Sequence, residues 1–292
     1  MNREIELEAH AKVNLTLEVL GKRDDGYHEI ASIMQTISLH DTLTLVEADD
    51  IVLECGHPGL SSPHNLALRA ARLLRDETGC KMGARLTLRK RIPVSAGLGG
   101  GSSDAAAALT GLSRLWGLDL AAEELMPLAA RLGSDVPFFL HGGTAGAFGH
   151  GEQVRRLPPA DLGWMVVLSP AIDVRDKTAS LYSRIVPAHY TRGYLTRKLE
   201  ARIRGGGDTP PQFLFNVFDE VARDAFPGLD DYWDTFHALG AREIHLAGSG
   251  PSLFAPVSRK EYGTAMELLL RHKYGWQAHL VSTWRPAEDE QE

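Results

Sequence analysis

The stretch PVSAGLGGGSSDAAAAL, residues 93–109, decides the fold, because it joins a glycine loop directly to a helix. Glycines stand at 97 and at 99–101, and the alanine-rich run that follows favours a helix. Backbone N–H groups at a helix N-terminus have no intrahelical partner, and the positive end of the helix dipole attracts an anion. A plain turn capped by Ser102 or Ser103 is the alternative. Four glycines exceed what a cap needs, so the stretch predicts a phosphate site.

The glycine spacing differs from the best-known phosphate loops. A dinucleotide-binding G-x-G-x-x-G pattern would require a glycine where Ser102 stands. A Walker A loop would require a lysine after the glycines, and none follows. The V-A-I-K and H-R-D motifs of protein kinases are also missing from the sequence. These mismatches argue against a dehydrogenase, a P-loop NTPase and a protein kinase.

Composition describes an ordinary globular protein. The chain has 292 residues, of which 43% are hydrophobic and 24% are charged, enough for one large domain or two smaller ones. The 31 Lys and Arg residues against 38 Asp and Glu give a net charge of −7. Because nucleic-acid affinity depends on neutralising phosphates, this balance argues against a nucleic-acid surface, while a local basic pocket for a nucleotide stays open.

Targeting and cysteine signals are weak. Cys55 and Cys80 are far apart and form no C-x-x-C motif, so neither a zinc site nor a disulfide framework is indicated. The charged N-terminal residues lack the apolar core of a signal peptide, and no run is long enough to span a membrane. We therefore expect a cytoplasmic protein that binds no membrane. Its expected state is a monomer or a homodimer.

Hydrophobic periodicity predicts a mixed α+β fold. Apolar residues at odd positions over 5–19 indicate one long strand, or two strands joined by a bend. Asn65 and Gly79 are typical caps for a helix over 66–78. The other predicted elements of this half are strands over 37–45 and 85–92 and helices over 103–116 and 121–132.

After Pro158 and Pro159 the pattern restarts. We expect strands over 164–168, within 243–257 and over 277–283, and helices near 176–185, 214–225, 229–239 and 259–272. Residues 187–212 are rich in Pro, Gly and Arg and are expected to be variable or mobile, and the acidic end 287–292 to be frayed. The fold class predicted is α+β, with two lobes that meet near residue 160.

Four segments together resemble one superfamily, the GHMP kinases. PVSAGLGGGSSDAAAA (93–108) resembles their central phosphate loop, and AGSGPSLFA (247–255) resembles their C-terminal glycine motif. AKVNLTLEVLGKRDDGYHEI (11–30) and LGSDVPFFLHGGTAGAFGHGE (132–152) resemble one branch, which acts on a CDP-linked methylerythritol. The triple glycine, A-K-x-N-L and D-G-Y-H are the diagnostic motifs of that branch.

The resemblance implies both a reaction and a fold. The reaction is phosphorylation by ATP of the tertiary 2-hydroxyl of the methylerythritol portion, in the non-mevalonate route to isoprenoids. The implied fold has an N-terminal, ATP-binding lobe over 1–160, like domain 2 of ribosomal protein S5. A ferredoxin-like lobe over 161–292 completes it, and the active site lies between the lobes.

The resemblance also assigns the chemistry to two residues. Asp135 is the implied base, although Pro137 also suits a helix start at which Asp135 would be an N-cap. A carboxylate that orients a crowded alcohol and accepts its proton is chemically reasonable. Lys12 is the implied cation that stabilises the transferring phosphoryl group. A solvated lysine on a strand face is the plainer interpretation of Lys12.

Binding roles follow from the same resemblance. For the acceptor, Tyr27 would stack on cytosine, His28 would read its edge, and Tyr182 would close the sandwich. Asn14 lies two residues from Lys12 and so on the same strand face. The substrate-binding set is Asn14, Tyr27, His28, Thr178, Tyr182, Gly248, Ser249 and Gly250. The ATP-binding set is Asn65, Pro93, Ala96, Gly97, Leu98, Gly99, Gly100, Gly101, Ser102 and Ser103.

Magnesium is expected with ATP, because phosphoryl transfer depends on charge neutralisation. Ser103 is the first choice for contact with Mg²⁺ and Ser102 the second; no carboxylate constellation in the sequence identifies itself as the ligand set. His150 and Glu152 match the H-x-E of zinc deaminases, but the P-C-x-x-C that such a site requires is missing.

Three other functions stay open at this point. One is a GHMP kinase acting on homoserine, mevalonate or a sugar, although such relatives generally lack D-G-Y-H and the triple glycine. Another is a nucleotide-binding relative that no longer catalyses, against which Lys12 and Asp135 argue. A dehydrogenase is the weakest. Residues 171–177 are longer than the usual loop before Thr178, so fine specificity is the least certain property.

Overall fold

The computed structural model describes residues 3–172 and 176–286, which belong to two compact units. The first unit, unit 1, consists of Met1–Ala11, Leu39–Val94 and Gly99–Gly142. The second, unit 2, consists of Lys12–Ser38, Ser95–Leu98 and Gly143–Glu292. The division falls inside the glycine loop and inside two long strands, so no single boundary in the sequence separates the units.

The odd-position alternation near the N-terminus forms one strand, β1 (Glu4–Lys22). Its neighbour β2 (His28–Ala48) is also a single long strand. In β1 every residue from Ala9 to Val19 is buried, so the polar residues between the apolar ones are buried too. The alternative interpretation of Lys12 as a solvated lysine on a strand face is therefore wrong, since only 4% of this residue is exposed.

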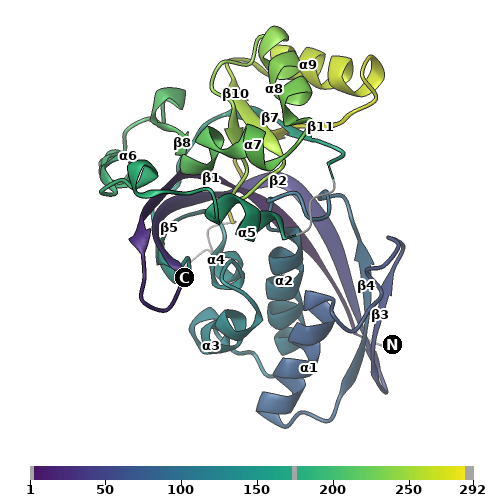
Figure 1. Ribbon diagram of the computed structural model, residues 1–292. Coiled ribbons are helices and arrows are strands. Elements are labelled where there is room, and N and C mark those ends of the chain that lie inside the picture. The colour runs from purple at the N-terminus through teal and green to yellow at the C-terminus, as the bar shows by residue number, and fades with distance from the viewer. Residues whose placement is uncertain (1–2, 173–175, 287–292) are drawn as a thin grey trace. The chain divides into compact units, whose positions relative to one another are not determined.

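Unit 1 packs helices against a sheet. In it β2 pairs antiparallel with β4 (Gly83–Arg89), and β4 pairs in parallel with β3 (Ile51–Cys55). Apolar residues of these strands share one core with the helices, which lie side by side in Figure 1. The helices are α1 (Leu66–Thr78), α2 (Gly100–Leu115), α3 (Ala122–Leu132) and α4 (Val136–His141).

Unit 2 contains two further groups of strands. The first part of β2 pairs with β5 (Thr144–Gly149), β5 with β6 (Gln153–Arg156), and β1 with β8 (Phe215–Asn216). A separate antiparallel sheet has the order β11-β7-β10-β9. Its strands are β7 (Trp164–Ser169), β9 (His245–Leu246), β10 (Leu253–Val257) and β11 (Gln277–Ser282).

The helices of unit 2 surround a second apolar core that includes Phe218, Phe226 and Phe236. Helix α9 packs on β7, β10 and β11. The α-helices are α5 (Lys177–Tyr182), α6 (Tyr194–Arg204), α7 (Ala222–Ala225), α8 (Leu229–Ala238) and α9 (Lys260–His272). Three short 3₁₀ turns are Pro187–His189, Pro211–Phe213 and Val217–Glu220. Helices and mainly antiparallel strand pairs confirm the α+β class.

Two predictions for the second half need correction. Residues 187–212 are largely ordered, because α6 buries Leu199 and Ile203, and Thr196 N–H donates to the Glu18 carboxylate at 2.7 Å. The helix expected over 214–225 is broken into β8, a 3₁₀ turn and the single turn α7. Asn216 causes the break, because its side chain accepts a bond from Phe218 N–H and caps the 3₁₀ turn. The end 287–292 lies outside the described residues.

No helix in the described part of the chain is both long and apolar enough to pass through a bilayer.

Candidate functional site

The glycine loop leads into α2 in the way expected of an anion site. Gly99 occupies the N-cap in the left-handed region (φ 73°) and, having no side chain, supplies no capping hydrogen bond. The first N–H to return into the helix is that of Ser103, which donates to Gly99 O at 2.9 Å. The N–H groups of Gly100, Gly101 and Ser102 thus precede the first intrahelical bond. The helix begins three residues earlier than predicted, so it already includes the glycines.

A buried ion cluster, which we call the Lys90 group, holds the start of α2. Lys90 Nζ donates to Asp104 at 2.8 Å and also to Asp41, and these side chains are 7%, 4% and 0% exposed. Asp41 also accepts the backbone N–H of Ile92 at 2.8 Å. Burial raises the pKa of Asp104 to about 7, although the charge of Lys90 opposes this. Within unit 1, the group fixes the end of β4 and the first turn of α2 together.

In unit 2 the two glycine loops meet backbone to backbone. A Cβ added to Gly97 would lie 2.0 Å from Ala247 O, and Gly97 has a φ of 84°. A Cβ added to Gly248 would lie 2.7 Å from Lys12 Nζ and 3.0 Å from Gly97 O. Glycine is needed at both positions because any side chain would separate the loops.

Lys12 lies at this meeting point with its ammonium held in place. Its Nζ donates to Asn14 Oδ1 at 2.7 Å, and Asn14 Nδ2 donates to Ser32 Oγ at 2.8 Å. The Lys12 backbone N–H donates to Leu98 O at 2.9 Å, which ties β1 to the glycine loop. Asn14 and Lys12 therefore share a strand face, as their spacing predicted.

A second lysine, Lys177, joins the same two loops. Its Nζ donates to Gly250 O at 2.7 Å and also to Ser95 O. Burial, followed by the nearby charge of Lys12, lowers the pKa of Lys177 to about 8. Among the described residues no carboxylate forms an ion pair with it. Sequence reasoning missed this residue, because a lysine at the start of a short helix carries no signal of its own.

Neighbouring hydroxyls extend the cationic region around Lys12 and Lys177. Thr178 Oγ1 and Ser249 Oγ are 2.8 Å apart, so these two predicted substrate residues lie together. Asn216 Nδ2 donates to Gly248 O at 2.8 Å and so fixes the backbone of the C-terminal glycine loop. Ser252 N–H donates to Ala96 O at 3.2 Å, a further link between the loops.

Aromatic rings gather where the nucleobase site was predicted. The rings of His28 and Tyr182 stack with centroids 4.8 Å apart and an interplanar angle of 21°. Tyr190 meets His28 edge-on at 6.4 Å. Burial, and then the charge of Lys22, lower the pKa of His28 and favour the neutral imidazole. A neutral imidazole both donates and accepts, which suits a group that reads a base edge.

Tyr27 lies apart from that stack. It is 62% exposed, and its ring centroid is 5.2 Å from that of His150. Tyr182 therefore faces His28 in this structure, while Tyr27 faces His150. The position of His150 beside Tyr27 is a tertiary contact that the sequence did not predict.

The roles predicted for the remaining site residues of unit 1 stay predictions, and the structure gives their burial and hydrogen bonds. Asp135 is half-buried at the start of α4, and its side chain makes no capping bond there. Asn65 does cap α1, accepting from Ala67 N–H at 2.9 Å, and its Nδ2 donates to Leu60 O at 3.0 Å. Ser103 is 3% exposed and Ser102 half-buried. Pro93, a further predicted ATP residue, is also half-buried.

Comparison with known proteins decides the family. A protein of Dehalococcoides mccartyi named 4-diphosphocytidyl-2-C-methyl-D-erythritol kinase is 43% identical over 281 residues, which cover 96% of this chain and 98% of the relative. A protein of the same name from Symbiobacterium thermophilum is 46% identical over 266 residues, covering 89% and 93%. This chain belongs to the 4-diphosphocytidyl-2-C-methyl-D-erythritol kinase family. The GHMP kinases N terminal domain model matches residues 65–143.

Solved structures agree with this membership. A crystal structure of 4-(cytidine 5'-diphospho)-2C-methyl-D-erythritol kinase has a TM-score of 0.80 at 34% identity and covers 95% of this chain and 98% of its own. Homoserine kinase from Cytophaga hutchinsonii has a TM-score of 0.73 at 18% identity, covering 96% and 94%. At that identity the likeness shows a shared GHMP kinase fold, as expected from the four sequence motifs.

Proposed function

We propose that this chain transfers the γ-phosphoryl group of ATP to the 2-hydroxyl of 4-diphosphocytidyl-2-C-methyl-D-erythritol. The observation that carries the proposal is the meeting of two glycine loops at Lys12 and Lys177 in a member of this kinase family. A site lined by backbone and by lysine side chains suits phosphate, because N–H groups and ammonium groups together neutralise the charge of the phosphate.

ATP is the donor in this proposal. The glycine loop, with the free N–H groups of the first turn of α2, holds the phosphates. Lys12, fixed by Asn14, stabilises the charge of the transferring group. Lys177 adds a second positive charge, available below its pKa of about 8. Asn65 borders the adenine in this proposal, in addition to its role as a cap.

Asp135 acts as the base. The substrate oxygen attacks the γ-phosphorus, the bond to the bridging β–γ oxygen breaks, and ADP leaves with its electron pair. Asp135 accepts the proton of the hydroxyl, and a tertiary alcohol gains most from being oriented as well as deprotonated.

The cytidine end of the acceptor binds at the aromatic cluster. His28 hydrogen-bonds the base edge, and Tyr27 and Tyr182 supply stacking faces. Since Tyr182 stacks on His28 in the structure, cytosine binding requires that Tyr182 or His28 turn to admit the base. Thr178, Ser249 and the loop glycines are placed near the phosphates of the acceptor by this proposal.

The residues beside the loop fit Mg²⁺ held chiefly by phosphate oxygens. The carboxylates of Asp41 and Asp104 are paired with Lys90, which leaves the hydroxyl oxygens of Ser102 and Ser103 as the protein ligands for the metal. Mg²⁺ commonly keeps several waters and binds through substrate phosphates, where it neutralises their charge. We propose that the reaction takes place in the cytoplasm, on a monomer or a homodimer that binds neither nucleic acid nor membrane.

An acceptor-competition assay tests the proposal. Purified protein with ATP and Mg²⁺ is offered the CDP-linked methylerythritol, homoserine or mevalonate, and ADP release is followed. We expect a kcat/KM for the CDP-linked acceptor that exceeds the others by at least about 10³, because a site built around a nucleobase loses its stacking and hydrogen bonds with the smaller alcohols. Comparable rates with homoserine or mevalonate, or no turnover with any acceptor, would contradict it.

A further inference from the structure

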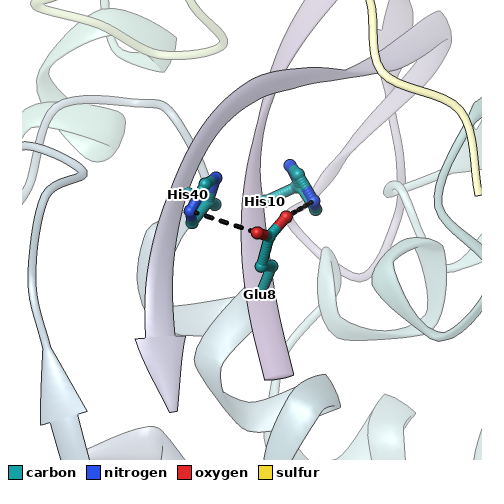
Figure 2. A group of neighbouring side chains, drawn as sticks. All are labelled: Glu8, His10 and His40. Carbon is teal, nitrogen blue, oxygen red and sulfur yellow. Dashed lines mark ion pairs between the residues drawn. The ribbon is translucent and has the colours of Figure 1, made fainter. Parts of the chain in front are cut away.

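A second set of ligand-type side chains lies in unit 1, on β1 and β2. Glu8, His10 and His40 converge there, with the Glu8 carboxylate between the two imidazole rings (Figure 2). His10 Nε2 lies 3.2 Å from Glu8 Oε2, and His40 Nε2 lies 3.6 Å from Glu8 Oε1. The ring centroids of His10 and His40 are 5.2 Å apart. Neither the phosphate chemistry nor the nucleobase chemistry proposed above uses these residues.

The sheet itself produces this convergence. Leu7 faces α2, because a Cβ added to Gly111 would lie 2.6 Å from Leu7 Cδ1. Alternation then places Glu8 and His10 on the opposite face of β1. Thr44 of β2 donates to Glu6 of β1 at 3.4 Å, which shows that even-numbered residues of the two strands share this face. His40 is even-numbered as well, so the three side chains meet across neighbouring strands.

The distances suit one metal ion. One potential ligand atom from each residue lies within 4.8 Å of the other two. Zn²⁺ binds imidazole nitrogen and carboxylate oxygen at about 2.0–2.2 Å, so tetrahedral ligands stand about 3.3 Å from one another. The two measured Glu–His separations, 3.2 and 3.6 Å, bracket that value. Small rotations of the side chains would close the third separation.

We propose that Glu8, His10 and His40 form a binding site for one Zn²⁺ ion that joins β1 to β2. Two imidazoles and one carboxylate are a zinc donor set, with the fourth position left for water. Nitrogen donors disfavour Mg²⁺, so this site is separate from the metal that accompanies ATP.

Burial supports a built site with an entry path. His10 and His40 are 6% and 21% exposed, and strand backbone fixes their positions. Glu8 is 57% exposed, so an ion can enter on its side. The competing explanation is a metal-free ion pair, in which Glu8 accepts an N–H from each imidazole. The cysteine count could not reveal such a site, because it contains no cysteine.

Zinc titration of the whole chain tests the proposal. Protein freed of metal with a chelator is titrated with ZnCl₂ in a calorimeter, and with CoCl₂ while its visible absorption is recorded. We expect one equivalent of Zn²⁺ to bind and to raise the thermal unfolding midpoint, since a ligand that binds only the folded state stabilises it.

Variants decide which residues bind the metal. His40→Ala and Glu8→Gln avoid the deeply buried His10 and should each weaken Zn²⁺ binding at least about tenfold. Loss of a residue that only supports a metal ligand already weakens binding by about 10- to 100-fold, and loss of a ligand itself should cost at least as much. His64→Ala is the matched control, since His64 is an exposed histidine of the same unit, and it should bind as wild type. No saturable binding by the wild type, or binding by His40→Ala and Glu8→Gln as tight as that of the wild type, would overturn the proposal.

Discussion

The Lys90 group of unit 1 and the Lys12–Lys177 region of unit 2 use buried lysines in opposite ways. Lys90 lies between two carboxylates, and the charges of Asp104 and Asp41 raise the pKa of Lys90 despite its burial. Lys177 has backbone carbonyls as its hydrogen-bond partners, and burial lowers its pKa to about 8. The first lysine is neutralised within the fold. The charge of the second is available to an anionic ligand.

The different partners of Lys90 and Lys177 show how a charge that stabilises the fold can be distinguished from a charge that binds a ligand. A neutralised cluster contributes to folding, and removal of one member leaves a buried charge uncompensated. A cation with only dipolar partners contributes little to folding and much to binding of phosphate. Variants in the two regions should therefore divide cleanly between loss of stability and loss of activity.

Asp135→Asn should have the largest effect. The variant keeps the shape of the side chain but removes the base, so kcat should fall by roughly 10²–10⁴. Binding of a non-hydrolysable ATP analogue, measured by calorimetry, should be unchanged. Asp76→Asn, the same substitution at an exposed carboxylate of unit 1, is the control. Near-normal turnover of Asp135→Asn would remove Asp135 from the mechanism.

Lys90→Met should be the most destabilising variant. It leaves Asp41 and Asp104 buried without their cation, which costs about 3–5 kcal/mol. Urea unfolding followed by circular dichroism measures the loss, and Lys81→Met provides an exposed control. If the two variants unfold at the same urea concentration, the Lys90 group does not have the structural role assigned here.

Lys177→Met should act on ATP rather than on folding. Loss of a charged hydrogen-bond donor should raise the KM for ATP roughly tenfold. In the wild type the same KM should rise above pH 8, because a lysine with a lowered pKa loses its proton there. Lys177→Arg stays charged and should remove this pH dependence. A purely structural lysine would leave the pH profile of Lys177→Arg identical to that of wild type.

His28→Ala should have the smallest and most selective effect. Loss of one stacking and edge-reading ring should raise the KM for the CDP-linked acceptor about tenfold, with little change in the KM for ATP. His272→Ala, an exposed histidine of unit 2, is the control. Equal increases in both KM values would mean that His28 does not contact the nucleobase.

Local signals in the sequence predicted much of the fold. Asn65 and Gly79 bound α1 as predicted, because capping depends on neighbouring residues alone. The alternation over 5–19 became β1 for the same reason. The ordering of 187–212 could not be predicted, because α6 is stabilised by distant partners such as Glu18. The two-residue strand β8 is too short to leave a periodic signal.

The candidate site was predictable only where a motif marks it. Lys12, Asn14 and the glycines were found from their resemblance to a family, and the structure brings Lys12 and Asn14 against Gly248. Lys177 and the contact of His150 with Tyr27 were missed, because both depend on tertiary contacts with residues far away in the sequence. Composition and periodicity contain no information about such contacts.

The most direct test of the central claim is phosphorus NMR of the reaction product. Wild-type protein is mixed with ATP, Mg²⁺ and the CDP-linked methylerythritol, and the phosphorus resonances are followed over time. The account predicts that a phosphomonoester on the tertiary carbon appears in step with ADP. Formation of inorganic phosphate with ADP, or phosphorylation at another hydroxyl, would contradict it.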